Sequence, residues 1–133
     1  MSQKYELIIS IALLLLLITS VDGIEIKVYN GWLVDQDNLC LYYLLSDNGN
    51  RASTCFDECL GDYVPFPSET FKDLSVISPL KESDFEYVKR SDGKYQVIYK
   101  GWPLYSYKRD KPNERNGVSG MWGAIYTENF PPY

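Results

Sequence analysis

Short segments in which apolar and polar residues alternate, each bounded by a turn dipeptide, constrain the fold of this chain most strongly. The segments are 24–29, 85–90 and 94–99, and the turn dipeptides are Asn30-Gly31 and Asp92-Gly93. Alternation with a period of two is typical of strands that bury one face. No window shows amphipathic helical periodicity over three turns. The sequence therefore predicts an all-β (mostly β) fold, a small compact domain of two related β-hairpin units.

The hairpin around Asp92-Gly93 also predicts a register. Asp-Gly suits the positive φ angles of a two-residue type I′ turn, and in that case Val88 faces Val97 across the ladder. Residues 62–80 are less regular, since they carry prolines at 65, 67 and 79 and lack alternation. This stretch predicts a connection, with one short helical turn near Phe71.

The N-terminus carries an uninterrupted apolar run, Leu7–Ile18. Its length suits the apolar region of a signal peptide better than a spanning helix of about 20 residues. The alternative is an uncleaved membrane anchor over residues 5–21. We therefore expect a signal peptide, or an N-terminal anchor helix, over residues 1–23, and a single β-rich extracytoplasmic domain over residues 24–133, secreted or held at a membrane.

Composition excludes several classes of function. The chain has no histidine, which removes imidazole general-base catalysis and the usual histidine-containing metal and haem sites. Its net charge of −5 has no basic patch to offset it, which argues against binding to nucleic acid. We expect no catalytic residue, no cofactor and no metal ligand.

Two segments of the chain resemble each other approximately, over residues 28–60 and 85–126. The similar pieces are Val28-Tyr29-Asn30-Gly31-Trp32 with Ile98-Tyr99-Lys100-Gly101-Trp102, and Leu41-Tyr42-Tyr43-Leu44-Leu45-Ser46-Asp47 with Leu104-Tyr105-Ser106-Tyr107-Lys108-Arg109-Asp110. Two related β units packed together are the simplest interpretation.

At these residues the chain resembles the secreted repeat of unknown function, a family of exported proteins that are often lipoproteins. Its Tyr-x-aromatic-x-x-Asp motif is complete in residues 105–110, whereas the first copy has Leu44 in the aromatic position. The resemblance implies an exported β module and a paired-cysteine turn at residues 55–59. No cysteine follows the apolar run as a lipid-attachment site would require.

The three cysteines divide into a pair and a single residue. Cys55 and Cys59 lie four residues apart in a chain that we expect to be exported, which favours a disulfide. A free or redox-active pair is the alternative. Cys40 is expected to be a small buried apolar residue, and an intermolecular disulfide is its alternative.

Four residues form a candidate ligand-binding site: Trp102, Tyr105, Tyr107 and Asp110. Such rings can form a platform for a sugar or a protein surface, and with twelve tyrosines in the chain core packing is the stronger alternative. Asp110 and Asp47 each end a predicted strand, where hydrogen bonds to a turn are the alternative to a role in binding a ligand or cation.

Three functions remain open. The first is a non-catalytic exported envelope or extracellular module, with an unknown protein or carbohydrate partner at the cell surface, no nucleic acid, and membrane contact only through the N-terminal segment. The second is an accessory subunit of a membrane complex, held by an uncleaved anchor. The third is a hydrolase that uses a carboxylate pair. The acidic residues for the third are Asp35, Asp37, Asp57, Glu58, Asp62, Asp84 and Glu86.

Overall fold

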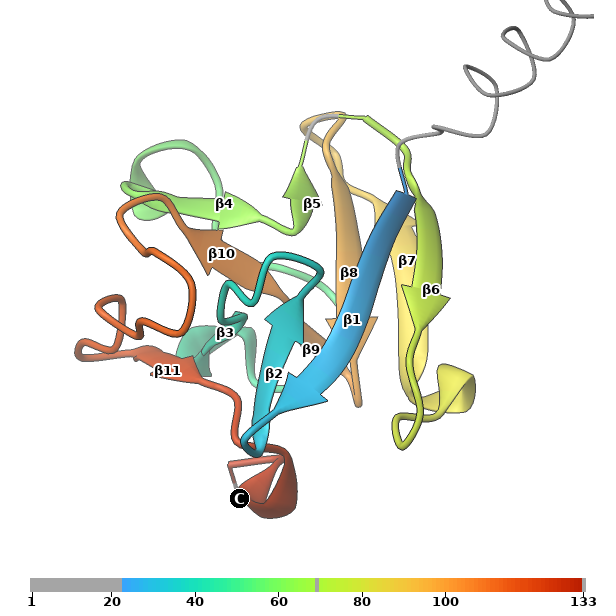
Figure 1. Cartoon of the computed structure of the whole chain (residues 1–133). Helices are drawn as coiled ribbons and strands as arrows, with labels where there is room; N and C mark the ends of the chain where they lie inside the picture. The colour runs from blue at the N-terminus through green and yellow to red at the C-terminus, as the bar shows by residue number, and fades with distance from the viewer. Residues whose placement is uncertain (1–22, 69, 133) are drawn as a thin grey trace, which may run out of the picture.

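The computed structural model of the chain describes residues 23–68 and 70–132, and these residues are mostly β, as predicted (Figure 1). The predicted signal peptide or anchor lies outside the described residues, except for Gly23. The described helical segments are four short 3-10 turns: Leu45–Asp47, Asp57–Cys59, Glu82–Asp84 and Thr127–Asn129. Over residues 23–68 and 70–132, no helix has the length and apolar character needed to cross a membrane.

The first sheet has the strand order β2-β1-β6. β1 (Gly23–Tyr29) forms an antiparallel hairpin with β2 (Trp32–Asp35) and pairs in parallel with β6 (Asp73–Val76). Ile24 and Ile26 are buried, and the residue between them is exposed. The alternation that predicts this strand thus directs its apolar face into the core.

The second sheet is built around β8. In it, β8 (Tyr95–Tyr99) lies between β5 (Pro67–Ser68) and β7 (Phe85–Lys89), and β9 (Trp102–Pro103) pairs with the end of β8. All of these pairings are antiparallel. The sheet packs its buried face against the first sheet, around a shared apolar core (Figure 1).

The third sheet mixes strands from both halves of the chain. Its order is β11-β3-β10-β4, formed by β11 (Trp122–Ala124), β3 (Tyr42–Leu44), β10 (Tyr105–Tyr107) and β4 (Tyr63–Pro65). Each neighbouring pair is antiparallel. Each of the two inner strands is therefore flanked on both sides by strands from the other half of the chain.

The third sheet is strongly curved. In a flat sheet the two outer strands of four lie about 14 Å apart, at roughly 4.8 Å per strand. Here Tyr63 of β4 and Trp122 of β11 stack with ring centroids 3.7 Å apart and an interplanar angle of 4°. The two outer strands therefore bring their side chains together over the concave face, which encloses a second core.

Two clusters of buried residues make up the core. The first consists of Ile24, Ile26, Leu33, Leu41, Phe66, Val97, Tyr99, Trp102, Leu104, Ile125 and Phe130. The second consists of Val34, Cys40, Tyr42, Leu44, Cys55, Leu60 and Tyr105. Because both clusters draw on residues from the two halves of the chain, neither half encloses a core by itself.

The hairpin of β7 and β8 forms as predicted, but its register differs by one residue. Val88 faces Gln96 instead of Val97, and Val97 faces Tyr87. Since successive side chains in a strand point to opposite faces, a shift of one residue changes which pairs share a face. The predicted register was therefore wrong.

The cause is the length of the loop. Arg90 and Lys94 close a three-residue loop, in which the Arg90 N–H donates to the Lys94 carbonyl oxygen at 2.7 Å. A type I′ turn needs two residues with positive φ, but of the predicted pair only Gly93 has one, at 84°. Asp92 instead accepts a hydrogen bond from the Lys94 N–H and pairs with Arg90.

The stretch predicted as a connection, residues 62–80, was also misjudged in part. It contains β4, β5 and β6, all of them short. The described residues around Phe71 form no helical turn. These strands have two to four residues each, which is too short for alternation to be recognised in the sequence.

A buried carboxyl group at the end of β2 predicts a pH effect on stability. Asp35 Oδ1 accepts hydrogen bonds from the N–H groups of Asp37 at 2.8 Å and Leu39 at 3.0 Å. Burial nevertheless raises the pKa of Asp35. Protonated Asp35 is therefore favoured in the folded state. The stability that this protonation adds is fully present below the unfolded pKa of about 3.9, and it is lost as pH rises through the raised folded pKa.

We expect the variant Asp35→Asn, which keeps the accepting oxygen, to gain stability relative to the natural protein as the pH rises from about 3 to about 7. Urea unfolding of both proteins at several pH values measures this difference. A difference that stays constant across this range would show that burial does not perturb Asp35.

Candidate functional site

The two similar segments contain turns of the same conformation. Between β1 and β2, Asn30 and Gly31 have φ angles of 50° and 87°, and between β8 and β9, Lys100 and Gly101 have φ angles of 50° and 88°. Two consecutive positive φ angles define the type I′ turn, and glycine meets this requirement without steric cost. The sequence similarity at Tyr-x-Gly-Trp therefore corresponds to a shared backbone geometry.

The two Tyr-x-x-x-x-Asp segments are joined crosswise. Tyr42 and Tyr105 are direct partners on the neighbouring strands β3 and β10. The Tyr105 hydroxyl donates to Asp47 Oδ2 at 2.7 Å, and the Tyr42 hydroxyl donates to Asp110 Oδ2. Each tyrosine thus binds the aspartate of the other segment, not its own.

Each aspartate also closes the loop that follows it. Asp47, with 0% of its surface exposed, accepts hydrogen bonds from the Thr54 N–H at 2.7 Å and the Thr54 hydroxyl at 2.8 Å. Asp110 accepts one from the Asn116 N–H at 2.9 Å. Both carboxylates are thus engaged by donors within the domain, which favours the turn-forming role over ligand or cation binding.

Burial is the main cause that raises the pKa of both motif tyrosines, Tyr42 and Tyr105. The neighbouring carboxylates Asp110 and Asp47 raise these pKa values further, because a second negative charge beside them is unfavourable. Both hydroxyls therefore stay protonated near neutral pH and act as hydrogen-bond donors. They are poor candidates for general bases or nucleophiles.

The strands that follow the two aspartates are exchanged. β4, which comes after Asp47, pairs with β10 of the other segment, and β11, which comes after Asp110, pairs with β3. The rings at equivalent places on these strands, Tyr63 and Trp122, are the two that stack across the concave face. The two segments are therefore interlocked.

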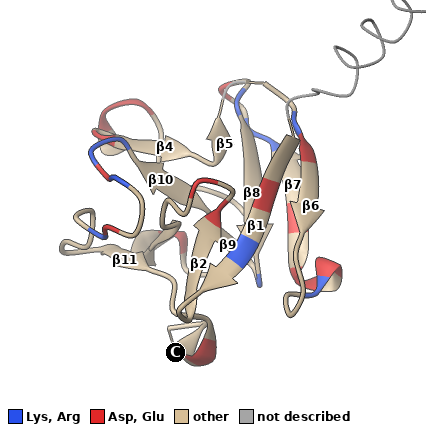
Figure 2. Cartoon of the chain, viewed as in Figure 1, with Lys and Arg blue, Asp and Glu red and all other residues tan. Residues whose placement is uncertain are grey.

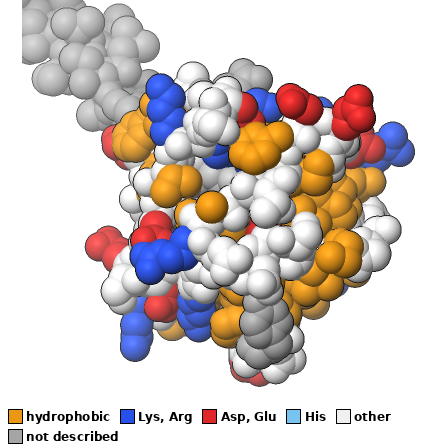
Figure 3. Space-filling model, turned by 180° about the vertical axis from the view of Figure 1, so that it is seen from behind, with side chains coloured by type: hydrophobic (Ala, Val, Ile, Leu, Met, Phe, Trp, Pro, Cys, Tyr) orange, Lys and Arg blue, Asp and Glu red, His pale blue; other side chains and the backbone are white. Residues whose placement is uncertain are grey.

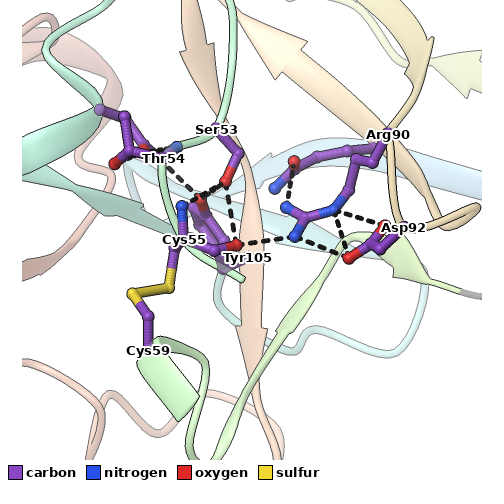
Figure 4. Close-up of a disulfide and its surroundings, with 9 residues drawn as sticks. Ser53, Thr54, Cys55, Cys59, Arg90, Asp92 and Tyr105 are labelled. Atoms are coloured by element: carbon purple, nitrogen blue, oxygen red, sulfur yellow. Dashed lines mark hydrogen bonds and ion pairs between the residues drawn. A yellow bond between two sulfur atoms is a disulfide. The ribbon is translucent and has the colours of Figure 1, made fainter. Parts of the chain in front are cut away.

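A buried arginine connects the second sheet to the disulfide (Figure 4). Arg90 forms an ion pair with Asp92 at 2.9 Å, and it donates to Gln96 Oε1 at 2.9 Å and to the Cys55 carbonyl oxygen at 2.7 Å. Its guanidinium carbon also lies 4.4 Å from the centroid of the Phe56 ring. Arg90 is thus a structural residue that the sequence interpretation missed.

The predicted disulfide between Cys55 and Cys59 is present. It closes a loop so short that the chain-entropy model gives a stabilisation of about 2 kcal/mol. We expect Cys59→Ser to lower the free energy of unfolding by about this amount in urea. A reducing agent should destabilise the natural protein equally and leave the variant unchanged; sensitivity of the variant to the reductant would contradict this assignment.

Part of the interlocked segments matches a known family. Residues 86–125 match the family described as a secreted repeat of unknown function. No curated protein and no solved structure matches the chain. The matched secreted repeat begins in β7 and ends directly after β11, so it includes Tyr105, Asp110 and the loop that Asp110 closes. Its description agrees with the expected export of the protein.

The secreted repeat contains all four residues of the predicted ligand site, but two of them are in the core. Trp102 and Tyr105 are 1% and 0% exposed. Neither ring can present a face to a ligand, so the prediction of an aromatic platform was wrong for these two residues. Tyr107 and Asp110 are half-buried, and Asp110 is engaged by Tyr42 and Asn116.

Three of the acidic residues considered for a hydrolase are also engaged within the domain. Asp35 holds its turn, Asp62 pairs with Arg109 at 3.0 Å, and Glu86 pairs with Arg51. In the described part of the chain, no group of three His, Cys, Asp or Glu side chains is arranged to hold a metal ion.

Cys40 is buried and unpaired. It lies beneath the guanidinium of Arg115, whose Nη1 is 4.0 Å from the sulfur and whose central carbon is 4.3 Å from the Trp32 ring centroid. Burial raises the pKa of the Cys40 thiol. These features favour the prediction of a small buried apolar residue over an intermolecular disulfide.

The exposed apolar side chains of the secreted repeat gather beside β11. Val118 and Met121 are 55% and 50% exposed, and the Leu45 N–H donates to the Met121 carbonyl oxygen at 2.9 Å, which places a third exposed apolar residue next to them. Tyr63 joins them, since it stacks on Trp122 and its hydroxyl donates to the Gly117 carbonyl oxygen. We call this surface the distal face: Leu45, Val118, Met121 and the edges of Tyr63, Tyr107 and Trp122.

Figure 3 shows hydrophobic side chains concentrated on the right of the molecule seen from behind, the side on which β4, β10 and β11 lie. A polar groove of 550 Å³ borders this surface at Tyr63, with Asp57, Lys94 and Lys108 among its lining residues. An apolar centre beside a polar border is the usual anatomy of a protein interface. No alternation in the sequence marks the distal face, because its exposed aliphatic residues lie outside the strands.

Proposed function

We propose that the protein is a non-catalytic extracytoplasmic module that binds another protein through the distal face. The observation that carries this proposal is that the polar residues of the motif are hydrogen-bonded within the domain, whereas the apolar residues of the distal face are exposed. The carboxylates and hydroxyls of the motif, those of Asp47, Asp110 and their tyrosines, are occupied by one another. Three of the six exposed large apolar side chains in the described part of the chain, Val118, Met121 and Leu45, lie instead on the distal face.

A protein partner fits this surface better than a carbohydrate does. Sugar platforms use the open faces of aromatic rings, but Tyr63 and Trp122 cover one face of each other in a parallel stack. What projects is aliphatic, and one side chain is methionine, whose flexibility suits contacts with protein surfaces. Exposed apolar residues that adjoin each other commonly mark an interaction site.

Support for a non-catalytic role comes from the same geometry. The crossed hydrogen bonds engage both carboxylates of the motif, Asp47 with three donors and Asp110 with two. A carboxylate that acts on a substrate needs a free oxygen directed toward it. The motif therefore builds the scaffold, and the distal face is the part left to meet a partner.

The test is site-specific photo-crosslinking in the native host. The full chain carries p-benzoylphenylalanine in place of Met121, and a control chain carries it in place of Ile77, an exposed apolar residue of a different loop. We expect a discrete protein adduct from position 121 only, which is abolished by Val118→Asp. Equal adducts from both positions, or none from position 121, would overturn the proposal.

A further inference from the structure

A second exposed aromatic cluster lies away from the distal face. Phe71 is 59% exposed, and its ring stacks on Tyr87 with centroids 5.0 Å apart and an interplanar angle of 22°. The Phe71 ring also packs edge-on against Tyr95, with ring centroids 5.7 Å apart. We call these three residues the Phe71 cluster. Packing against two tyrosines holds the phenylalanine in place while most of its surface stays in solvent.

Two lysines lie beside the Phe71 cluster. Lys89 Nζ lies 5.9 Å from the centroid of the Tyr95 ring, and the Lys72 N–H donates to the Tyr87 hydroxyl at 3.2 Å, which places this residue at the same edge. Figure 2 shows basic and acidic residues side by side at this end of the domain, where β6 begins and where β7 and β8 are joined. Two acidic residues lie at the same end: Asp73 follows Lys72 directly, and Asp92, which pairs with Arg90, lies in the loop between β7 and β8.

Aromatic rings beside lysines suit the interface between a bilayer and water. The ring of phenylalanine enters the apolar boundary, and tyrosine keeps its hydroxyl among polar headgroups. Lysine buries its aliphatic stem and directs its ammonium group toward phosphate. Because Asp73 and Asp92 offset part of the positive charge, the attraction comes mainly from apolar and aromatic contact, and the charge of Lys89 adds to it.

The path of the chain places this end of the domain near the apolar N-terminal run. Gly23, the first residue of β1, pairs with Asp73, the first residue of β6, two residues after Phe71. Only residues 19–22 separate Gly23 from the apolar run that ends at Ile18. Even fully extended, this connection spans no more than roughly 17 Å.

We infer that the Phe71 cluster is a second membrane contact, which seats the end of the domain on a phospholipid bilayer. The sequence predicts membrane contact only through the N-terminal segment, and this inference adds a contact on the folded domain. The inference does not depend on the partner of the distal face. In Figure 1, β11 lies on the left of the molecule, while β1 and β6 begin at its upper right, so both surfaces can be occupied together.

The test uses the full chain, reconstituted in vesicles of phosphatidylcholine and phosphatidylglycerol. Phe71 is replaced by p-benzoylphenylalanine in one chain and Val118 in another, and lipid adducts are measured by mass spectrometry after irradiation. We expect several-fold more lipid adduct at position 71, and a reduced yield there when Lys89→Glu is added. Equal yields at both positions, or adducts at 71 to a second copy of the chain, would overturn the inference.

A second experiment distinguishes binding of the Phe71 cluster to the bilayer from mere proximity caused by the N-terminal segment. A flexible linker of about 20 Gly and Ser residues, inserted after residue 22, lets the domain move tens of ångströms from the bilayer. We expect most of the lipid adduct at position 71 to persist with the longer linker. If the adduct falls to the level of position 118, the N-terminal segment alone causes the proximity, and the Phe71 cluster is no membrane contact. The protein adduct at position 121, which tests the distal face, is measured in a separate experiment, so either proposal can fail without the other.

Discussion

Asp47→Ala is expected to lower the free energy of unfolding by about 4 kcal/mol, because it removes a buried charged acceptor, and each donor that loses such an acceptor costs roughly 1 to 3 kcal/mol. The variant leaves the Thr54 N–H and hydroxyl without their acceptor, and it removes one of the two partners of the Tyr105 hydroxyl. Domains of this size have total stabilities of about 5–15 kcal/mol. Urea unfolding followed by tryptophan fluorescence measures the loss.

Two variants serve as controls for Asp47→Ala. Asp47→Asn keeps an oxygen for Thr54, so we expect it to recover a large part of the lost stability. Asp37→Ala removes an exposed carboxylate near the end of β2, and surface changes of this kind usually stay within about 0.5 kcal/mol. If Asp47→Ala were no more destabilising than Asp37→Ala, the carboxylate of Asp47 would have to be free for another role.

The second large effect is expected at Arg90. Arg90→Met fills similar space but leaves Gln96 Oε1 and the Cys55 carbonyl oxygen without their donor, and breaking buried networks of this kind costs about 3 kcal/mol. Its neighbour Lys89 is exposed, so Lys89→Met is a matched control with an expected change below about 0.5 kcal/mol. Urea unfolding of both variants provides the comparison.

The Arg90 variant also has a pH signature. The hydrogen bond from Arg90 lowers the pKa of Asp92, so the stability that the pair adds is present above the unfolded pKa of about 3.9 and is lost as pH falls through the lower folded value. The difference in free energy of unfolding between the natural protein and Arg90→Met should therefore become smaller in strong acid. The part of this difference that comes from the hydrogen bonds of Arg90 to Gln96 and Cys55 should remain. A difference that widened in acid would contradict the assigned ion pair.

Local features of the fold could be predicted from the sequence, because neighbouring residues determine them. The β1 strand and the Asn30-Gly31 turn depend on alternation and on positive φ angles, which few residues tolerate. The loop after β7 could not be predicted in the same way. Its three-residue form depends on a pair of side chains, Arg90 and Asp92, and the other partners of Arg90 are Cys55, far along the chain, and Gln96 in the next strand.

The burial of the predicted ligand site had a different cause. Alternation shows that Tyr105 and Tyr107 share a face, but it does not show whether that face is enclosed. The third sheet curves until Tyr63 and Trp122 meet, and this closes the concave face over Tyr105. The exchange of β4 and β11 is a non-local pairing, and no spacing within either segment specifies it.

The most direct test of the interlocked arrangement is a set of double-mutant cycles on the four motif residues, with Tyr→Phe at 42 and 105 and Asp→Ala at 47 and 110. We expect coupling energies of about 1 kcal/mol or more for Tyr42 with Asp110 and for Tyr105 with Asp47. The pairs within one segment, Tyr42 with Asp47 and Tyr105 with Asp110, should couple by less than about 0.5 kcal/mol. Stronger coupling within a segment than across the two segments would contradict the crossed scaffold.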